Sequence, residues 1–301
     1  MLISVIIPVF NGERFIATAI KSALQQEEVY EVIVVNDGST DQTEEICNAI
    51  IKSNNKVKYF RLPINKGPSA ARNIGLEKSK GRYISFLDAD DYFLPKRFKK
   101  SIKVLETSPM IDGVYSIVKN QGFEKYDKNQ PQAKILGIKD SIQPEDLFSY
   151  VVKDTHDFFS IISLVFRREV LNRIDWFDES LKYSEDIDFI YSLSSQYKLV
   201  SDQEQIPKIV RIVHDQNLTI NPEINPATMR FPIVDKWYQK MINDGFNLSS
   251  NWSLMRRFLH VNYYRKDVHL GKLARIGLKL FIFLGEVITH PVLIYRLTFG
   301  K

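Results

Sequence analysis

Apolar, largely β-branched runs alternate with runs of helical periodicity along the first part of the chain. In one helical run, over residues 13–26, apolar side chains recur at the spacing that places them on one face of a helix. The pattern predicts strands over 3–10, 30–36, 56–63 and 81–91, and helices over 13–26, 39–52 and 67–79.

Local signals agree with these boundaries. Ser39, Thr40 or Asp41 supplies a cap for the second helix, and Pro68 opens the third, where its missing N–H matters little. The strands are almost entirely apolar and alternate with helices. This pattern predicts an α/β fold in which a mostly parallel sheet has helices on both faces.

Polar residues follow the predicted strands at Asn11, Asp37, Asn65 and Asp88 to Asp91. Ligands of such sheets bind beyond the carboxyl ends of the strands. We therefore expect these side chains to meet at one edge. The sequence Asp37-Gly38-Ser39 is also ordinary turn chemistry, and that alternative stays open.

The segment "DADD" places three carboxylates within four positions, at Asp88, Asp90 and Asp91. Asp91 is interpreted as an N-cap for a helix over 94–105. An extended Asp88-x-Asp90 would direct both side chains to one side. Paired carboxylates suit Mg²⁺ or Mn²⁺ shared with substrate phosphates.

Composition narrows the class of protein. The chain has 301 residues, 44% hydrophobic and 26% charged, which is typical of a folded globular protein. The single cysteine, Cys47, is expected to be a buried apolar residue and fits a reducing compartment. No signal-peptide pattern opens the sequence and no apolar run is long enough to span a bilayer, so we expect a cytoplasmic protein.

The net charge of +5 is concentrated at the end of the sequence. Residues 264–301 carry seven basic and two acidic side chains, so the first 263 residues are balanced, which argues against nucleic-acid binding. Within 268–301 one helical stripe is apolar and the other basic, which predicts a helix lying on the inner face of a membrane. Packing on the catalytic domain or on a partner in a homodimer is the alternative.

Four segments together resemble the successive motifs of family 2 glycosyltransferases. They are "SVIIPVFNGERFIATAIKSALQQ", "EVIVVNDGSTDQT", "NKGPSAARNIGLEKSKGRYISFLDADD" and "FDESLKYSEDIDF", and the resemblance covers roughly residues 2 to 200. It implies an inverting, metal-dependent enzyme with the GT-A fold, a Rossmann-like and mostly parallel sheet. The expected domains are a catalytic one over 1–220 and a helical C-terminal region over 221–301.

The resemblance also implies a donor and an acceptor. The donor would be a UDP-sugar carrying a hexosyl or N-acetylhexosaminyl unit. The acceptor would be a saccharide, as on a lipid-linked glycan in capsule, exopolysaccharide or O-antigen assembly. The residues implied for the donor nucleotide are Pro8, Phe10, Asn11, Asp37, Lys66, Gly67, Arg72, Asp88 and Ala89.

Among these, Asp37 matches the acid that accepts a hydrogen bond from uracil N3, although Asn36 stands where the family has a second acid. Arg72 matches the family's arginine near the base and phosphates. The metal, Mn²⁺ or Mg²⁺, would be held by Asp90, with Asp88 on the ribose or the metal's water shell.

On the acceptor side the resemblance makes Asp186 the general base, with Glu185 supporting it or orienting the acceptor. An ordinary helix N-terminus, which favours acids, is the alternative. Further candidates are His214 for the metal, Arg211 for the diphosphate, and Trp176 and His156 for the acceptor. Asn217 departs from the family pattern beside His214.

Two functions of other classes compete with this interpretation. A dinucleotide-binding α/β protein would share the alternating pattern, but no G-x-G-x-x-G follows a strand. A non-catalytic nucleotide-sugar-binding homologue would lack the paired aspartates or the base, and this sequence has both.

Overall fold

The structure is a computed structural model that describes residues 2–122, 135–138, 142–152 and 159–214, with short pieces at 232–233, 236–237 and 239–240. The chain divides into two compact units, Met1–Val151 with Thr155–Asn221, and Val152–Asp154 with Pro222–Lys301. His156 and the predicted membrane segment 268–301 lie outside the described residues. No helix within the described ranges has the length and apolar character needed to cross a membrane.

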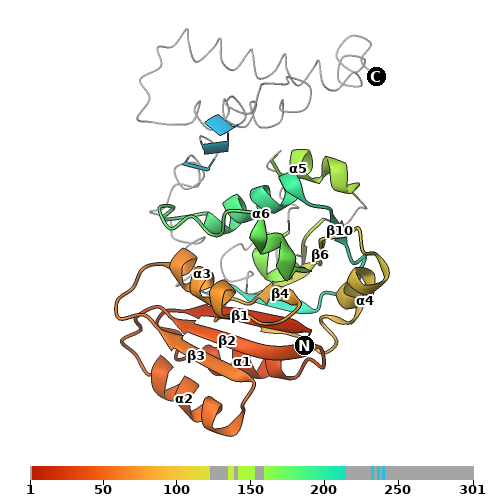
Figure 1. The fold of residues 1–301 in the computed structure, drawn as a ribbon. Coiled ribbons are helices and arrows are strands. Elements are labelled where there is room, and N and C mark those ends of the chain that lie inside the picture. Colours follow the sequence, from red (N-terminus) through yellow and green to blue (C-terminus); the bar gives the residue numbers. More distant parts are fainter. Residues whose placement is uncertain are drawn as a thin grey trace, which may run out of the picture. The chain divides into compact units, whose positions relative to one another are not determined.

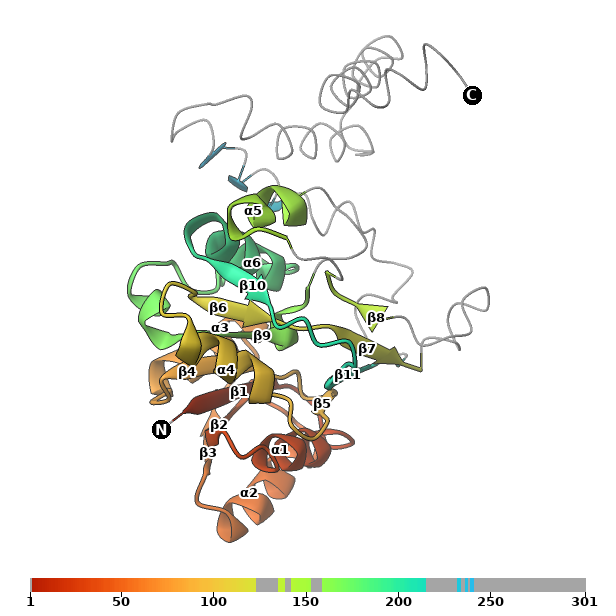
Figure 2. The same ribbon diagram turned by 90° about the vertical axis from the view of Figure 1, so that its right-hand side faces the viewer.

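The first unit contains the elements shown in Figures 1 and 2. In chain order they are β1 (Ile3–Val9), α1 (Ile16–Leu24), β2 (Val29–Asn36), α2 (Thr43–Ser53), β3 (Val57–Arg61), α3 (Pro68–Lys78), β4 (Tyr83–Phe86), β5 (Tyr92–Phe93), α4 (Lys99–Thr107), β6 (Gly113–Tyr115), β7 (Val118–Gln121), β8 (Ile135–Leu136), α5 (Pro144–Val152), η2 (Ile161–Ser163), β9 (Leu164–Arg167), η3 (Arg168–Asn172), α6 (Glu185–Gln196), β10 (Leu199–Ser201) and β11 (Ile209–Ile212).

A seven-stranded sheet in the order β10-β6-β9-β4-β1-β2-β3 forms the core. The strands β3, β2, β1 and β4 are parallel, whereas β9 runs antiparallel between β4 and β6. Helices α1 and α2 lie on one face of the sheet and α3 on the other (Figure 1). The predicted α/β fold with a mainly parallel sheet is therefore confirmed, and the GT-A-like layering is present.

The strands and helices predicted for the first 90 residues are all present, but the fourth strand, expected over 81–91, ends at Phe86. Strands β1, β2 and β4 are buried on both sides because helices cover both faces, as in the fully buried side chains of Val5, Ile6 and Ile33. Pro68 stands at the first position of α3, and Asp41 accepts the N–H of Thr43 at the start of α2 (3.0 Å). Cys47 is buried, as expected, and burial raises the pKa of its thiol to about 12.

The prediction that Asp91 caps a helix over 94–105 is wrong. Helix α4 begins at Lys99, and the strand β5 stands between it and the aspartates. The buried Asp91 carboxylate accepts the N–H of Ile212 in β11 (2.8 Å). It thus connects the aspartate turn to a second sheet, with the order β5-β11-β7-β8. No local pattern could predict this pairing, because Asp91 and Ile212 are far apart along the chain.

Helix α3 approaches β1 closely at Gly75. A Cβ built on this glycine would lie 2.3 Å from Cγ2 of Ile6, which is fully buried. Ile6 has a stiff, β-branched side chain and cannot move aside easily. The absence of a side chain at Gly75 therefore sets the distance between α3 and the sheet.

We predict that Gly75→Ala destabilises the protein although alanine favours helices. The helix preference contributes about 1 kcal/mol of stability, whereas overpacking of a dense core costs about 1–3 kcal/mol. The free energy of unfolding, measured by denaturant titration, should fall. Lys78→Ala, at an exposed position of the same helix, is the control and should change it by no more than about 0.5 kcal/mol. A gain in stability for Gly75→Ala would contradict the packing argument.

Candidate active site at the carboxyl edge of the sheet

A hollow of about 360 Å³ opens where β1, β2 and β4 end. In the sheet, Val9 is paired with Asn36 and Ile6 with Phe86, so the residues that follow these strands emerge at one edge. The hollow is lined by Pro8, Val9, Phe10, Asn11, Gly12, Phe15, Asp37, Asn65, Gly67, Pro68, Ala71, Arg72, Asp88, Ala89, Asp90 and His214. Every residue predicted for the donor nucleotide except Lys66 is in this set.

Two loops at the edge of the hollow are fastened together by Asn11. Its backbone is left-handed (φ 50°), its N–H donates to Oγ of Ser39 (2.9 Å), and its Oδ1 accepts the N–H of Thr40 (2.9 Å). Asn36 also stabilises the loop that contains Ser39, because its Oδ1 accepts the N–H of Ser39 (2.8 Å). The amide that stands in place of the family's second acid therefore fixes the loop geometry.

Asp37 connects the end of β2 to the start of α3. Its buried carboxylate accepts the N–H groups of Lys66 (2.7 Å) and Gly67 (2.8 Å). Gly67 has φ 93°, and a Cβ built on it would meet no heavy atom within 4 Å, so this backbone faces open space. The carboxylate retains further lone pairs, and its contact with uracil stays a prediction. Lys66 contributes its backbone N–H to this arrangement.

Arg72 joins the hollow to the first turn of α6. One terminal nitrogen donates to Oε1 of Glu185 (2.6 Å) and the other to Oδ1 of Asp88 (3.0 Å). The side chain is 6% exposed, and its guanidinium lies 5.4 Å from the centre of the Phe177 ring. Within the described part of the chain, its buried Nε has no hydrogen-bond partner. Its predicted contact with base and phosphates stays a prediction, whereas the bridge between two carboxylates was not anticipated.

The first turn of α6 carries Glu185, Asp186 and Asp188, preceded by Ser184 in a left-handed conformation (φ 61°). Burial, and then the charge of Glu185, raise the pKa of Asp186 to about 6, although Arg72 acts in the opposite direction. Oδ1 of Asp186 accepts the N–H of Ile187 (2.9 Å). The acids do open a helix, as one interpretation expected. The role of Asp186 as general base stays a prediction, with which a pKa of about 6 is compatible.

A turn of the backbone, and not the alternation of side chains along a strand, brings the side chains of Asp88 and Asp90 to the hollow. Strand β4 ends at Phe86, and the N–H of Asp91 donates to the carbonyl of Asp88 (3.1 Å). The extended Asp88-x-Asp90 that we expected is therefore wrong, although both side chains do line the hollow. Nε2 of His214 lies 2.9 Å from Oδ2 of Asp90, and its ring stacks on Phe15 at 4.9 Å.

The paired aspartates fit a divalent cation in the chemistry of their donors. Burial, and then the charge of Asp88, raise the pKa of Asp90, so a cation bound between the two carboxylates would offset their repulsion. Carboxylate oxygens are the ligands that Mg²⁺ and Mn²⁺ prefer. In the described ranges no three His, Cys, Asp or Glu side chains gather as a complete metal site. The remaining ligands would thus have to come from substrate phosphates and water.

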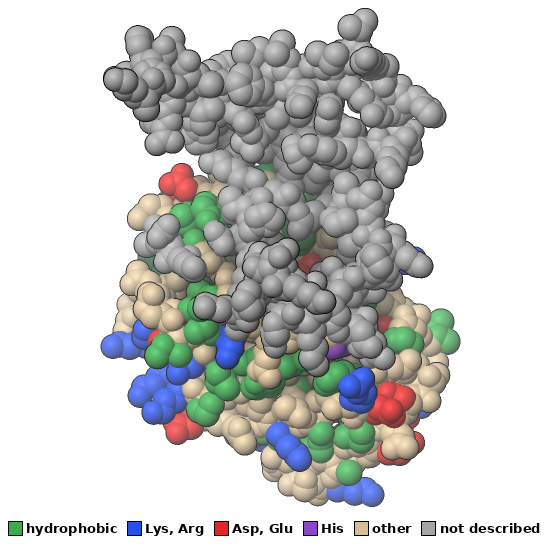
Figure 3. All heavy atoms as spheres, turned by 180° about the vertical axis from the view of Figure 1, so that it is seen from behind, with side chains coloured by type: hydrophobic (Ala, Val, Ile, Leu, Met, Phe, Trp, Pro, Cys, Tyr) green, Lys and Arg blue, Asp and Glu red, His purple; other side chains and the backbone are tan. Residues whose placement is uncertain are grey.

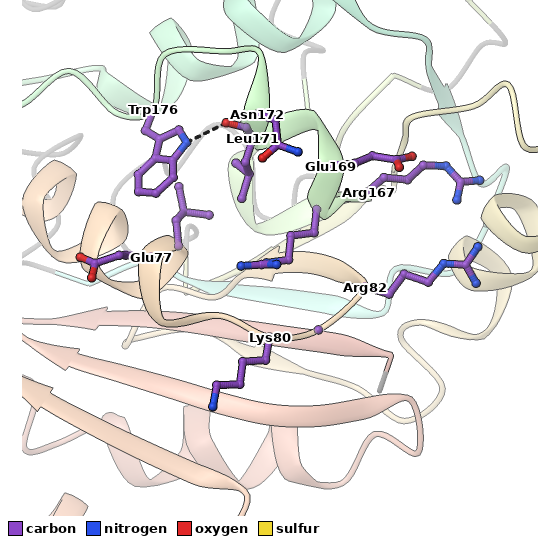
Figure 4. Close-up of a pocket in the computed structure, with 11 residues that line it drawn as sticks. Glu77, Lys80, Arg82, Arg167, Glu169, Leu171, Asn172 and Trp176 are labelled. Atoms are coloured by element: carbon purple, nitrogen blue, oxygen red, sulfur yellow. Dashed lines mark hydrogen bonds between the residues drawn. The ribbon is translucent and has the colours of Figure 1, made fainter.

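Other predicted residues lie elsewhere. Arg211 is in β11, paired with Asn120 of β7, and does not line the hollow. Trp176 lines a different hollow, drawn in Figure 4, with residues at the opposite end of α3. His156 lies outside the described residues. The structure adds Phe15 to the site, a residue that the helical pattern had assigned only to the apolar face of the first helix.

A family model described as Glycosyl transferase family 2 matches residues 4–175. The chain belongs to this family. Curated relatives carry the same general description. An uncharacterized glycosyltransferase of Rickettsia typhi is 32% identical over 72% of this chain and 66% of the relative. One of Haemophilus influenzae is 47% identical over 35% of this chain and 42% of the relative. The chain thus spans less than two thirds of the length of these curated relatives.

Solved structures share the fold of this family 2 glycosyltransferase. The crystal structure of S. aureus TarS 1–349 in complex with UDP-GlcNAc has a TM-score of 0.67 and 20% identity, covering 95% of this chain and 81% of that one. GalNAc-T7 with UDP, GalNAc and Mn²⁺ has a TM-score of 0.51 and 18% identity, covering 71% of this chain and 44% of that one. At such identities the likeness extends to the fold alone.

We predict that Arg72→Gln destabilises the protein strongly, because it leaves the buried carboxylate of Glu185 without its ion pair. Breaking a buried pair costs about 3 kcal/mol or more. Arg61→Gln serves as the control. It removes the ion pair between Arg61 and Glu44, whose side chains are 45% and 34% exposed, respectively. Its effect on the free energy of unfolding should not exceed about 1 kcal/mol. Similar losses for the two variants, measured by denaturant titration, would show that the bridge has no special role.

Proposed function

We propose that this family 2 glycosyltransferase transfers a hexosyl or N-acetylhexosaminyl unit from a UDP-sugar to a saccharide acceptor, with inversion at the anomeric carbon. The observation that carries the proposal is the Arg72 bridge, which holds Asp88 of the hollow and Glu185, the neighbour of Asp186, on one guanidinium. A donor-side and an acceptor-side carboxylate are thereby kept in one cluster. The structures of TarS with UDP-GlcNAc and with UDP support UDP as the donor nucleotide.

The donor nucleotide would occupy the hollow. Phe10 lines it and is half exposed, so its ring offers an apolar surface to a base. The Asn11 and Asp37 networks fix the loops around it before a ligand arrives, which lowers the entropy lost on binding. The backbone at Gly67 leaves room for the close approach of the nucleotide.

Asp186 would act as the general base. It takes the proton of the acceptor hydroxyl while the oxygen attacks the anomeric carbon from the side opposite the diphosphate. The new glycosidic bond forms as the bond to the diphosphate breaks, and a single displacement of this kind inverts the configuration. Glu185, held by Arg72, would position the base.

Asp90 would hold a divalent cation, with Asp88 on its water shell or on the ribose and His214 oriented by Asp90 and Phe15. When bound, Mg²⁺ or Mn²⁺ supplies a Lewis acid that stabilises negative charge on the departing diphosphate. Because the cation would stabilise the charge of the departing diphosphate, no acidic side chain is needed to protonate this leaving group.

The acceptor and the place of action are proposed from the sequence. A basic, amphipathic segment over 268–301 suits a peripheral enzyme on the cytoplasmic face of a membrane that works on lipid-linked glycans. An uncharacterized glycosyltransferase of Bacillus subtilis named EpsJ, 29% identical over 62% of this chain and 54% of the relative, supports glycosyl transfer in general.

Asp186→Asn should retain UDP binding and lose transfer, because the amide has the size of the acid but accepts no proton. A reduction of about 10²–10⁴-fold in turnover is expected for the loss of a general base. In the unmodified enzyme the base works when deprotonated, so activity should be lost as the pH falls through about 6. Turnover of a UDP-sugar and calorimetric UDP binding measure the two effects. Full turnover by the variant would exclude Asp186 as the base.

With UDP present, Mn²⁺ should raise the thermal unfolding midpoint of the unmodified protein further. Asp90→Asn should abolish this additional increase, because the variant loses a charged oxygen ligand. Asp112→Asn provides the control. The Asp112 carboxylate accepts the backbone N–H of Lys198, and the residue does not line the hollow. Its Mn²⁺-dependent shift with UDP should equal that of the unmodified protein. An unchanged shift in Asp90→Asn would overturn the metal assignment.

A further inference from the structure

A second hollow, of about 570 Å³, lies at the end of α3 that is farther from the candidate active site. Its lining includes Glu77 near the end of α3, Gly81 and Arg82 just before β4, and Arg168 at the start of η3 (Figure 4). The two hollows share no lining residue. Helix α3 has 11 residues and therefore separates them by about 16 Å.

Positive charge exceeds negative charge in this hollow, since four basic and two acidic side chains line it. Two of the basic groups have structural partners. Arg167 donates to the carbonyls of Ile111 and Leu105, and Arg82 pairs with Glu106 (2.9 Å). The exposed Lys80 and Arg168 have no side-chain ion pair among the described residues. These two cations are therefore available to a ligand.

The backbone that carries the two cations is rigidly held. The N–H of Lys80 donates to Oε1 of the buried Glu31 (2.7 Å), and the N–H of Arg168 donates to the carbonyl of Arg82 (2.9 Å). A Cβ on Gly81 would lie 2.5 Å from the backbone nitrogen of Ser4, so only glycine permits this close approach. The backbone from which the two cationic side chains extend is thus fixed before any ligand binds.

Trp176 supplies an aromatic surface to the same hollow. Its Nε1 donates to the carbonyl of Leu171 (3.1 Å), which fixes the ring and satisfies its only polar group. Figure 4 shows the indole at one side of the hollow, Arg82 at the other, and Lys80 at its lower edge with its side chain directed away from the indole. The fixed indole could pack against the apolar face of a sugar ring. Glu77 and Asn172, which also line the hollow, could form hydrogen bonds with its hydroxyl groups.

We propose that this hollow is a second saccharide site that binds an anionic sugar, with its ring on Trp176 and its carboxylate or phosphate on Lys80 and Arg168. If the acceptor is a polymer that contains such anionic sugars, binding it at a point away from its reactive end would raise the local concentration of that end at the active site. The site is independent of the donor and of the assignment of Asp186, since it shares no residue with either.

Calorimetry on the full chain tests the proposal with three probes: trigalacturonate, glucose 6-phosphate and the neutral maltotriose. Trigalacturonate or glucose 6-phosphate should bind more tightly than maltotriose, and which of the two binds distinguishes carboxylate from phosphate recognition. In the double variant Lys80→Gln/Arg168→Gln the affinity for the anionic probe should fall about tenfold or more, because two charged hydrogen bonds are lost. Trp176→Phe should keep most of the affinity, whereas Trp176→Ala should lose it.

Arg173→Gln is the matched control, since Arg173 is an exposed arginine near Arg168 that does not line the hollow. It should leave the affinity for the probe unchanged. UDP affinity should be the same in every variant, which separates this site from the candidate active site and reports on folding. The proposal is overturned if neither anionic probe binds, if Arg173→Gln weakens binding as much as the double variant does, or if anionic vesicles or RNA displace the probe through the same two residues.

Discussion

The candidate site depends on one buried cation. The Arg72 guanidinium lies between Asp88, which follows β4, and Glu185, which begins α6, and it is almost fully removed from water. Without it, Asp88, Glu185 and Asp186 would repel one another in a poorly solvated space. Because the arginine sits on α3, the helix that Gly75 allows close to β1, packing in the core sets where the charges of the site lie.

Patterns within short stretches of sequence predicted the parallel half of the fold, because β1, β2 and β4 are buried on both faces, whereas β3 at the edge of the sheet is only partly buried. The antiparallel β9 and the four-stranded sheet were not predicted. Their strands are short and pair with segments far away in the sequence, as Phe166 does with Ile84 and Val210 with Lys119. Such pairing is decided by tertiary contacts and leaves no periodicity to detect.

The same distinction applies to the site. Residues that directly follow a strand, such as Asn11, Asp37 and Asp88, were predictable because the edge of a parallel sheet collects them. The partners of those residues were not. Neither the ion pairs of Arg72 nor the stacking of Phe15 on His214 is encoded by spacing. Trp176, which the resemblance suggested for the acceptor, lines a hollow at the other end of α3, and its role in acceptor binding stays a prediction.

The structure also separates two uses of buried carboxylates. Glu31 and Asp37 accept backbone N–H groups and hold loops in place, which is a structural role. Asp90 and Asp186 lie among other acids, and burial raises the pKa of each. Folding alone does not favour such groups, since a charge in that setting destabilises the protein unless a cation or proton neutralises it. On the face shown in Figure 3, basic and acidic side chains lie near one another, unlike the cluster of acids around Asp90 and Asp186. Their persistence at the edge of the sheet is therefore better explained by chemistry performed there than by stability.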